Sequence, residues 1–211
     1  PSVGSHYHQK SPGTFGKAAG FSFQGAKMLA TGQGGMFVTD DLQIFERAVS
    51  IYNHGRDASK GTFFSSEVGY NYKMPNLVAA MGLAQLERID ELVAHKHMLR
   101  DLYMDRLGAI EGFVFQKDFG AARSNWSYPS IRIEPKIINR DNLIEKLAKR
   151  GIDSRPAFPR MSTMPAFKEV SAPRAEIIAK TGINLPTAGY LDENDVNIIC
   201  DNILEISGIE G

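Results

Sequence analysis

Residues 18–40 read AAGFSFQGAKMLATGQGGMFVTD and contain two short apolar runs, Gly20–Phe23 and Met36–Thr39. The segment between these runs is rich in glycine and other small residues, which is typical of a loop between two strands. We therefore predict a strand, a loop and a second strand here. The loop carries one lysine, Lys27, and the first run contains Ser22.

Lys27 is the candidate for chemistry in this loop. A lysine that forms a Schiff base needs a fixed position and surroundings that favour its neutral amine, and a loop at a strand end provides the first. The glycines let backbone approach a bulky planar ligand closely. Ser22 offers a hydroxyl and a backbone N–H suited to a phosphate ester. From residue types alone, a solvated surface lysine in a glycine-shaped hairpin explains the segment better.

Two helices and a long loop are predicted next. Residues 41–53 carry apolar side chains at helical spacing, with Asp40 or Asp41 as the N-cap. Residues 53–76 show no period and contain glycine, asparagine, proline and several aromatic residues, so we expect a long ordered loop, and such loops are usually functional. Asn76 is then expected to cap a helix that runs to about residue 107.

The remaining chain predicts a smaller α+β region. A strand pair is expected around residues 113–115 and 128–133, followed by a helix over 139–150 with Gly151 just past its end. A last helix is expected over 193–206, opened by a capping pair formed by Asp192 and Asp195. We place the division near residue 110, inside or after the long helix.

Composition excludes several classes of protein. The 211 residues carry 24 Lys plus Arg and 24 Asp plus Glu, and this balance argues against a nucleic-acid binder, which needs a basic stripe. The pattern predicts neither a transmembrane helix nor a signal peptide, so we expect a cytoplasmic setting and no membrane contact. Cys200 is expected to pack in a core. The start at Pro1, without methionine, suggests a processed, split or truncated polypeptide.

Several ordered segments together resemble one family of enzymes, the DegT/DnrJ/EryC1/StrS sugar aminotransferases. Residues 21–41, FSFQGAKMLATGQGGMFVTDD, are similar to the family's cofactor-lysine signature. NHGR at 53–56 and GYNYKM at 69–74 resemble its Asn-His-Gly and Gly-Tyr-Asn-Tyr-Arg-Met elements. LVAAMGLAQLERID at 77–90 resembles its long-helix signature, and residues 185–196 resemble its closing segment.

The resemblance implies a fold-type I aminotransferase that uses pyridoxal 5'-phosphate (PLP). Residues 1–110 would be the C-terminal part of the large α/β, PLP-binding domain, including the long connecting helix, and residues 111–211 the small α+β domain. Lys27 would hold PLP covalently and move the proton between cofactor and substrate carbon, and Ser22 would contact the cofactor phosphate. Asn71 would reach the phosphate of the neighbouring subunit's cofactor, in a homodimer with shared active sites. Without the resemblance, Asn71 reads as a turn residue.

The substrates implied are glutamate as amino donor and a nucleotide-linked keto-deoxysugar as acceptor. His54 and Arg56 could orient an anionic substrate, or they could equally stabilise their own loop. Residues 151–167 resemble the small-domain loop of aminotransferases that make perosamine-type sugars, which makes Arg155 and Phe158 candidates for substrate contact. His6 and His8 lack accompanying carboxylates or cysteines, so a solvated strand is favoured over a metal site.

The family's N-terminal half has no counterpart in this sequence. Pro1–Gly4 resembles the residues directly after the family's Asp-Ala-Ala element, so the aspartate that pairs with the pyridine nitrogen would precede Pro1. We therefore expect a complementary chain, a fuller parent chain or a rearranged oligomer. Two alternatives remain. A sugar dehydratase of the same fold carries histidine in place of the lysine, so Lys27 counts against it; a non-catalytic fragment or subunit would complete a partner's site.

Overall fold

The computed structural model describes residues 3–209, which form two compact units. The first contains the chain up to Leu92 together with Phe119–Asn125, and the second contains Val93–Asp118 and the chain from Trp126 onward. The division falls inside one helix, earlier than the boundary near residue 110 expected from the sequence. The reason is that the later turns of this helix pack into the core of the second unit.

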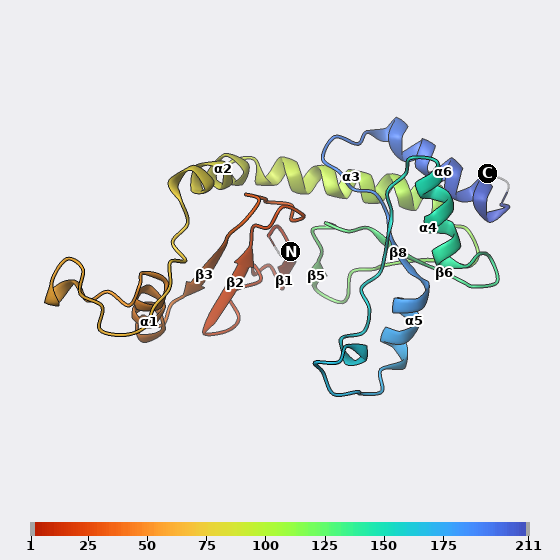
Figure 1. Ribbon diagram of the computed structural model, residues 1–211. Coiled ribbons are helices and arrows are strands. Elements are labelled where there is room, and N and C mark those ends of the chain that lie inside the picture. Colours follow the sequence, from red (N-terminus) through yellow and green to blue (C-terminus); the bar gives the residue numbers. More distant parts are fainter. Residues whose placement is uncertain (1–2, 210–211) are drawn as a thin grey trace. The chain divides into compact units, whose positions relative to one another are not determined.

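An antiparallel hairpin dominates the first unit. Strands β2 (Ala18–Ser22) and β3 (Gly35–Thr39) pair along their full length, so the predicted strand, loop and strand are confirmed (Figure 1). Gly35 fits this pairing because a Cβ at that position would collide with the carbonyl oxygen of Phe21. A second short pair joins β1 (His6–Tyr7) to β5 (Ala122–Arg123). The Lys27 loop is therefore held between two paired strand ends.

Helix α1 (Leu42–Tyr52) follows the hairpin and begins as the sequence predicts. The side chain of Asp41 accepts hydrogen bonds from the backbone N–H groups of Gln43 and Ile44 at 3.0 and 3.2 Å. These bonds satisfy two of the donors that a helix leaves unpaired at its start. The long connection after α1 contains one short 3-10 helix, η1 (Ala58–Lys60).

The long helix predicted from residue 76 to residue 107 is wrong as a single element. Two helices occupy this range, α2 (Asn76–Leu86) and α3 (Ile89–Leu107). The N–H of Arg88 donates to the carbonyl of Gln85, three residues back, so the last turn of α2 tightens there. Asn76 is also not the cap, since Pro75 holds that position and no side chain bonds the helix start. Neither glycine nor proline marks the break, so no local pattern predicts it.

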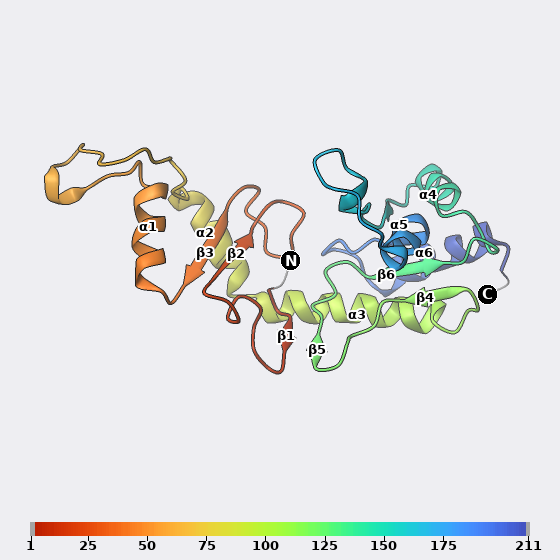
Figure 2. The ribbon, with the colours of Figure 1, turned by 90° about the horizontal axis from the view of Figure 1, so that it is seen from below.

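The second unit is built on a four-stranded antiparallel sheet. Its order is β4 (Phe113–Phe115), β6 (Ser130–Ile133), β8 (Gly182–Asn184) and β7 (Arg155–Pro156). The predicted strand pair is confirmed by β4 and β6, in which Phe113 lies opposite Ile133. Figure 2 shows these two strands beside the last turns of α3. Strands β7 and β8 were not predicted, because two or three residues are too few to display a period.

Three helices pack around this sheet. Helix α4 (Arg140–Lys149) is capped by Asn139, and α6 (Glu193–Ser207) begins with reciprocal bonds between Asp192 and Asp195, as predicted. The unpredicted elements are η2 (Met161–Thr163) and α5 (Pro173–Thr181). The core joins all layers and includes Leu99, Tyr103, Leu107, Phe113, Ile131, Ile133, Leu143, Leu147, Ile183, Val196, Cys200 and Ile203.

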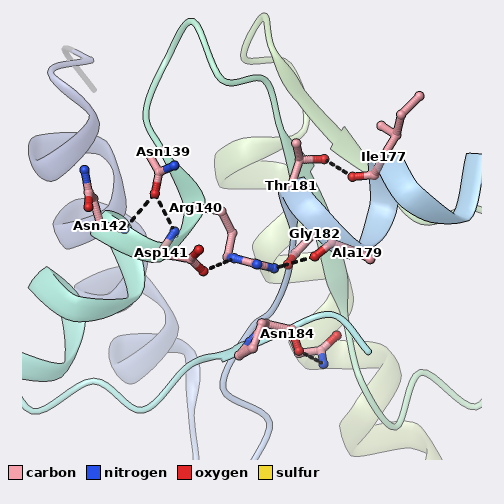
Figure 3. A network of polar contacts seen from close by, with 10 residues as sticks. Asn139, Arg140, Asp141, Asn142, Ile177, Ala179, Thr181, Gly182 and Asn184 are labelled. Atoms are coloured by element: carbon pink, nitrogen blue, oxygen red, sulfur yellow. Dashed lines mark hydrogen bonds and ion pairs between the residues drawn. The ribbon is translucent and has the colours of Figure 1, made fainter. Parts of the chain in front are cut away.

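A buried arginine ties α4 to the end of α5. Figure 3 shows the Arg140 side chain, which is 10% exposed, reaching two backbone carbonyl groups at the C-terminal end of α5. It donates to Ala179 O at 3.1 Å and to Gly182 O at 2.7 Å. A positive charge at a helix C-terminus also interacts favourably with the helix dipole. Arg140 thereby fixes the point where α5 passes directly into β8.

Helix α3 also holds the segment that leads into α6. The hydroxyl of Tyr103 donates to Pro186 O at 2.9 Å, and Lys96 Nζ donates to Thr187 Oγ1 at 2.7 Å. Burial lowers the pKa of Lys96 below its ordinary value.

Among residues 3–209, none of the helices combines the length and the apolar character that a bilayer crossing requires.

Candidate functional site

Lys27 and Ser22 line the same small cavity in the first unit. Its volume is about 130 Å³, and its wall is made by Val3, Gly20, Phe21, Ser22, Lys27, Met28, Leu29 and Asn125. Lys27 is half-buried, and no ion pair of its side chain is found within the described residues. An amine without a carboxylate partner remains available for a ligand. Ser22 and Lys27, the two residues of this segment selected from the sequence, thus lie at one cavity.

The backbone of the Lys27 loop is held by hydrogen bonds across its base. The N–H of Phe23 donates to Gly34 O at 3.0 Å, and the N–H of Thr31 donates to Phe23 O at 2.7 Å. Within the loop, the N–H of Lys27 itself donates to Gln24 O at 2.9 Å. These bonds extend the β2–β3 pairing beyond its last strand residues. The loop is therefore a folded turn, and Lys27 has a defined backbone position.

Helix α2 supports the same loop through one glutamine. Gln85 Oε1 accepts the N–H of Ala30 at 3.0 Å, and its Nε2 donates to Ala30 O at 2.5 Å. One side-chain amide thus satisfies both backbone groups of a residue three positions after Lys27. Gly82 permits the close approach, because a Cβ there would lie 3.1 Å from Thr31 Cγ2. The sequence suggested α2 only as an apolar helix, so Gln85 was missed.

Asn125 and Val3 complete the cavity, and neither was selected from the sequence. Asn125 is 3% exposed and lies just after β5, about a hundred residues along the chain from Lys27. An asparagine in a loop is normally interpreted as a turn residue, so composition and spacing carry no signal for this position. Pro1 and Ser2, which belong to the stretch that resembles the residues directly after the family's Asp-Ala-Ala element, lie outside the described residues.

His54, Arg56 and Asn71 lie in the ordered connection between α1 and α2. Asn71 forms an isolated bridge with Asn53, and the N–H of His54 donates to Tyr70 O at 3.0 Å. The Arg56 guanidinium lies over the ring of Phe63, 5.5 Å from its centre. None of the three lines the Lys27 cavity as far as the described residues define it. Their roles toward a cofactor or substrate stay predictions.

Two carboxylates stabilise this connection. Hydrogen bonds from Ser59 and Ser66 lower the pKa of Asp57 to about 2. Bonds from Arg47 and Ser50 of α1 likewise lower the pKa of Glu67. A lowered pKa means that these contacts favour the charged carboxylate, so they persist at neutral pH and weaken in strong acid. The connection is a structured segment tied back to α1.

Arg155 and Phe158 belong to the second unit. Arg155 lies in β7 with its guanidinium 3.3 Å from the carboxylate of Asp153, and Phe158 is 79% exposed in the loop that follows. An exposed guanidinium and an exposed ring are accessible to a ligand. Substrate contact by these two residues stays a prediction.

The two N-terminal histidines lie in exposed surroundings. His6 is in β1, and His8 follows it with a positive φ of 47°. Within residues 3–209, no group of three or more His, Cys, Asp or Glu side chains is gathered in the manner of a metal site. His6 therefore lies in a short exposed strand, whereas His8 lies in the turn that follows it.

Comparison with known sequences gives a consistent family. The profile of the DegT/DnrJ/EryC1/StrS aminotransferase family matches residues 1–204. The GDP-perosamine synthase of Escherichia coli O157:H7 is 34% identical over 204 residues, which are 96% of this chain and 55% of that protein. The putative pyridoxal phosphate-dependent aminotransferase EpsN of Bacillus subtilis strain 168 is 30% identical over 212 residues, 97% of this chain and 54% of that protein.

Solved structures agree on the fold. The aminotransferase TlmJ from Streptoalloteichus hindustanus superposes with a TM-score of 0.89 at 24% identity, over 98% of this chain and 56% of that one. The predicted fold class, part of a large α/β region followed by a smaller α+β region, is confirmed. The chain spans about half the length of the curated relatives it matches.

Proposed function

Because the chain belongs to the DegT/DnrJ/EryC1/StrS aminotransferase family, we propose that Lys27 binds pyridoxal phosphate and that the whole protein aminates a nucleotide-linked keto sugar. The observation that carries this proposal is the shared cavity of Lys27 and Ser22. Enzymes of this family are PLP-dependent. The printed name of the relative EpsN, a putative PLP-dependent aminotransferase, supports the same cofactor.

The cavity residues fit such a cofactor chemically. A half-buried primary amine suits an aldehyde, and a serine hydroxyl suits a phosphate ester. The glycine at position 20 leaves part of the wall open for a planar ring. When bound, PLP withdraws electrons from the carbon attached to the substrate nitrogen. Lys27 then supplies two functions from one side chain, as covalent anchor and as the base that moves a proton at that carbon.

The remaining site residues are proposed from the family. Asn71 would contact the cofactor phosphate of a second subunit, and His54 and Arg56 would orient an anionic substrate or stabilise their own loop between α1 and α2. Arg155 and Phe158 would contact the sugar substrate. We assign the first unit to the large PLP-binding domain and the second to the small C-terminal domain, with the boundary between residues 92 and 110.

The proposed substrates are a nucleotide-linked keto-deoxysugar and glutamate as amino donor. The name of the Escherichia coli relative, GDP-perosamine synthase, supports a nucleotide-linked amino sugar as the product class. Lys27 argues against a sugar dehydratase of the same fold, in which histidine replaces this lysine. We propose that the protein acts in polysaccharide biosynthesis.

We also propose that the first unit is completed by further polypeptide, either the half of the relatives that this chain does not match or a second subunit of a homodimer. An open groove of about 620 Å³ along α1 supports this proposal, since its wall is almost wholly apolar and includes Phe37, Ile44, Ala48, Ile51, Tyr52 and Tyr72. Phe37 and Tyr72 of this groove are each more than half exposed, and exposed apolar side chains gathered in one place are typical of a contact surface.

Covalent trapping tests the assignment of Lys27. The chain is incubated with PLP, reduced with borohydride and analysed by peptide mass spectrometry. We expect the pyridoxyl group on Lys27, because its amine is preorganised beside Ser22. Lys27→Ala should abolish the trapped product. Lys17→Ala, which removes an exposed lysine of the same unit, should leave it unchanged.

A label spread evenly over exposed lysines would contradict the assignment. Repeating the trapping after co-expression with the N-terminal half of a relative separates two cases. A label that appears on Lys27 only in the complex indicates a split enzyme. A chain that never takes the label, but still joins the complex, indicates a non-catalytic subunit.

A further inference from the structure

Asn125 links the N-terminal segment to the Lys27 cavity. Its Nδ2 donates to Val3 O at 2.7 Å, and its backbone N–H donates to Ser5 Oγ at 3.1 Å. Val3 and Asn125 both line the cavity that contains Lys27. Among the residues described, Asn125 is thus bonded to both ends of a three-residue segment that forms part of the cavity wall.

The surrounding backbone makes this link specific. The segment Val3–Ser5 turns at Gly4, whose φ is 80°, and leads directly into β1. Asn125 lies two residues after the end of β5. Strands β1 and β5 pair with His6 opposite Arg123. Strand pairing therefore brings Asn125 near Ser5, but it does not fix the residues before Ser5. The side-chain amide of Asn125 is what extends the attachment to Val3.

We propose that Asn125 is a positioning residue for Lys27. It fixes Val3–Ser5 as one wall of the cavity, limits the access of water to the lysine amine, and keeps space beside Lys27 for a planar ligand. The role rests on the proposed function, since it gives Lys27 a fixed place for covalent chemistry. Asn125 acts through Val3 and needs no contact with the reacting atoms.

Asn125→Asp is the sharpest change, because it keeps the size of the side chain and removes the donor to Val3 O. A carboxylate oxygen facing a carbonyl oxygen is repelled in a buried site, so the segment should detach from the cavity. Lys27 then becomes more accessible to solvent and to small reagents. Lys17, which is exposed in the same unit, serves as the internal standard for reactivity.

The experiment measures the acetylation rate of each lysine in the full chain with acetic anhydride and peptide mass spectrometry. We expect the rate of Lys27 relative to Lys17 to rise by between about twofold and about tenfold in Asn125→Asp, the range that corresponds to the loss of one hydrogen bond. Borohydride trapping of PLP on Lys27 should fall in the same variant, while the melting temperature reports any general loss of stability.

Asn184→Asp is the matched control. Asn184 Nδ2 also donates to a backbone carbonyl, Pro156 O at 3.3 Å, but it lies in the second unit. This variant should leave the relative rate of Lys27 unchanged. If Asn125→Asp does not fold, Ser5→Ala removes the hydrogen bond from the Asn125 N–H. This variant should also raise the acetylation rate of Lys27 relative to Lys17, by a smaller factor.

An unchanged relative rate of Lys27 in the folded Asn125 or Ser5 variant would overturn the proposal. The two proposals fail separately. Lys27 acetylation that responds to Asn125→Asp in a chain that never takes PLP would refute the cofactor assignment and leave the positioning role intact. PLP trapped on Lys27 equally well in wild type and variant would refute the positioning role alone.

Discussion

Cys200 shows how burial can dominate the chemistry of a side chain. It lies on the inner face of α6 with no exposed surface, and burial raises the pKa of its thiol to about 12. The thiolate is the reactive form, so its fraction at neutral pH falls tenfold for each unit of increase in pKa. The predicted role of Cys200 as core packing is confirmed.

We predict that Cys200 resists thiol reagents until the second unit unfolds. At pH 8 the folded chain should react with an aromatic disulfide reagent more slowly than the denatured chain by a factor of about 10³ or more, since both thiolate fraction and access are reduced. Because the folded pKa is raised, the protonated thiol stabilises the fold below pH 9. That contribution is lost as the pH rises from 9 to about 12.

The measurement is the reaction rate followed by absorbance, with and without denaturant. Equal rates for the folded and denatured chain would contradict the burial of Cys200. The chain has one cysteine, so no second thiol complicates the assignment.

Single residues were predicted well where their role is local. Asp41 was expected to cap a helix and does so, because a cap depends only on the next two or three backbone N–H groups. Asn125 was missed because its partners, Val3 and Ser5, lie about 120 positions away. No local pattern can identify a contact of that kind.

The hairpin loop depends on helix α2 in a way that a substitution can test. We predict that Gln85→Ala accelerates hydrogen exchange of the Ala30 amide by about fivefold, because the amide loses Gln85 Oε1 as its acceptor and a net hydrogen bond contributes about 1 kcal/mol. NMR-detected exchange at Ala30 is the measurement. The amides of β6 in the second unit should be unaffected.

Gln43→Ala is the control for this substitution. Gln43 is a glutamine of α1 in the same unit, and its side-chain amide makes none of the hydrogen bonds identified among the described residues. The Ala30 amide should exchange at the wild-type rate in this variant. An Ala30 amide that is insensitive to Gln85→Ala would show that the loop is held by its own backbone bonds alone.

At the level of elements, strongly periodic segments were predicted and short or interrupted ones were not. The apolar spacing of α1, α4 and α6 is sufficient to identify them. The break between α2 and α3 was missed because Glu87 and Arg88 are good helix formers. Gln85, whose carbonyl accepts the N–H of Arg88 at the tightened turn, also bonds Ala30 of the hairpin loop through its side chain.

The two units differ sharply in how much apolar surface they bury. In the first unit Leu29 is the only large hydrophobic side chain that is buried among residues 3–209, whereas the second unit has a core of more than a dozen. Large apolar side chains stay exposed on the first unit, including Phe37, Phe45, Phe63, Val68, Tyr72 and Leu77. Burial of apolar area is the main stabilising contribution to folding, so the second unit should be the more stable one.

We predict that amide exchange separates the two units. The slowest amides should lie in β6, β8 and α6, and those of α1 and α2 should exchange at least about tenfold faster, since local opening costs less where little apolar surface is buried. Hydrogen exchange with mass spectrometry provides the measurement. Added polypeptide that completes the first unit should slow the exchange of the α1 amides and leave the exchange of the second unit unchanged. Uniform exchange across both units would contradict this account.

The sequence by itself determined the family, the hairpin around Lys27, the helix caps and the core face of α6, because these depend on residue order and on contacts between near neighbours. Only the tertiary structure decided that Val3 and Asn125 share a cavity with Lys27, that Gln85 supports the loop and that the long helix is broken. These features join residues far apart in the chain. Hydrogen-bond geometry between such residues exists only once the strands have paired and the helices have packed.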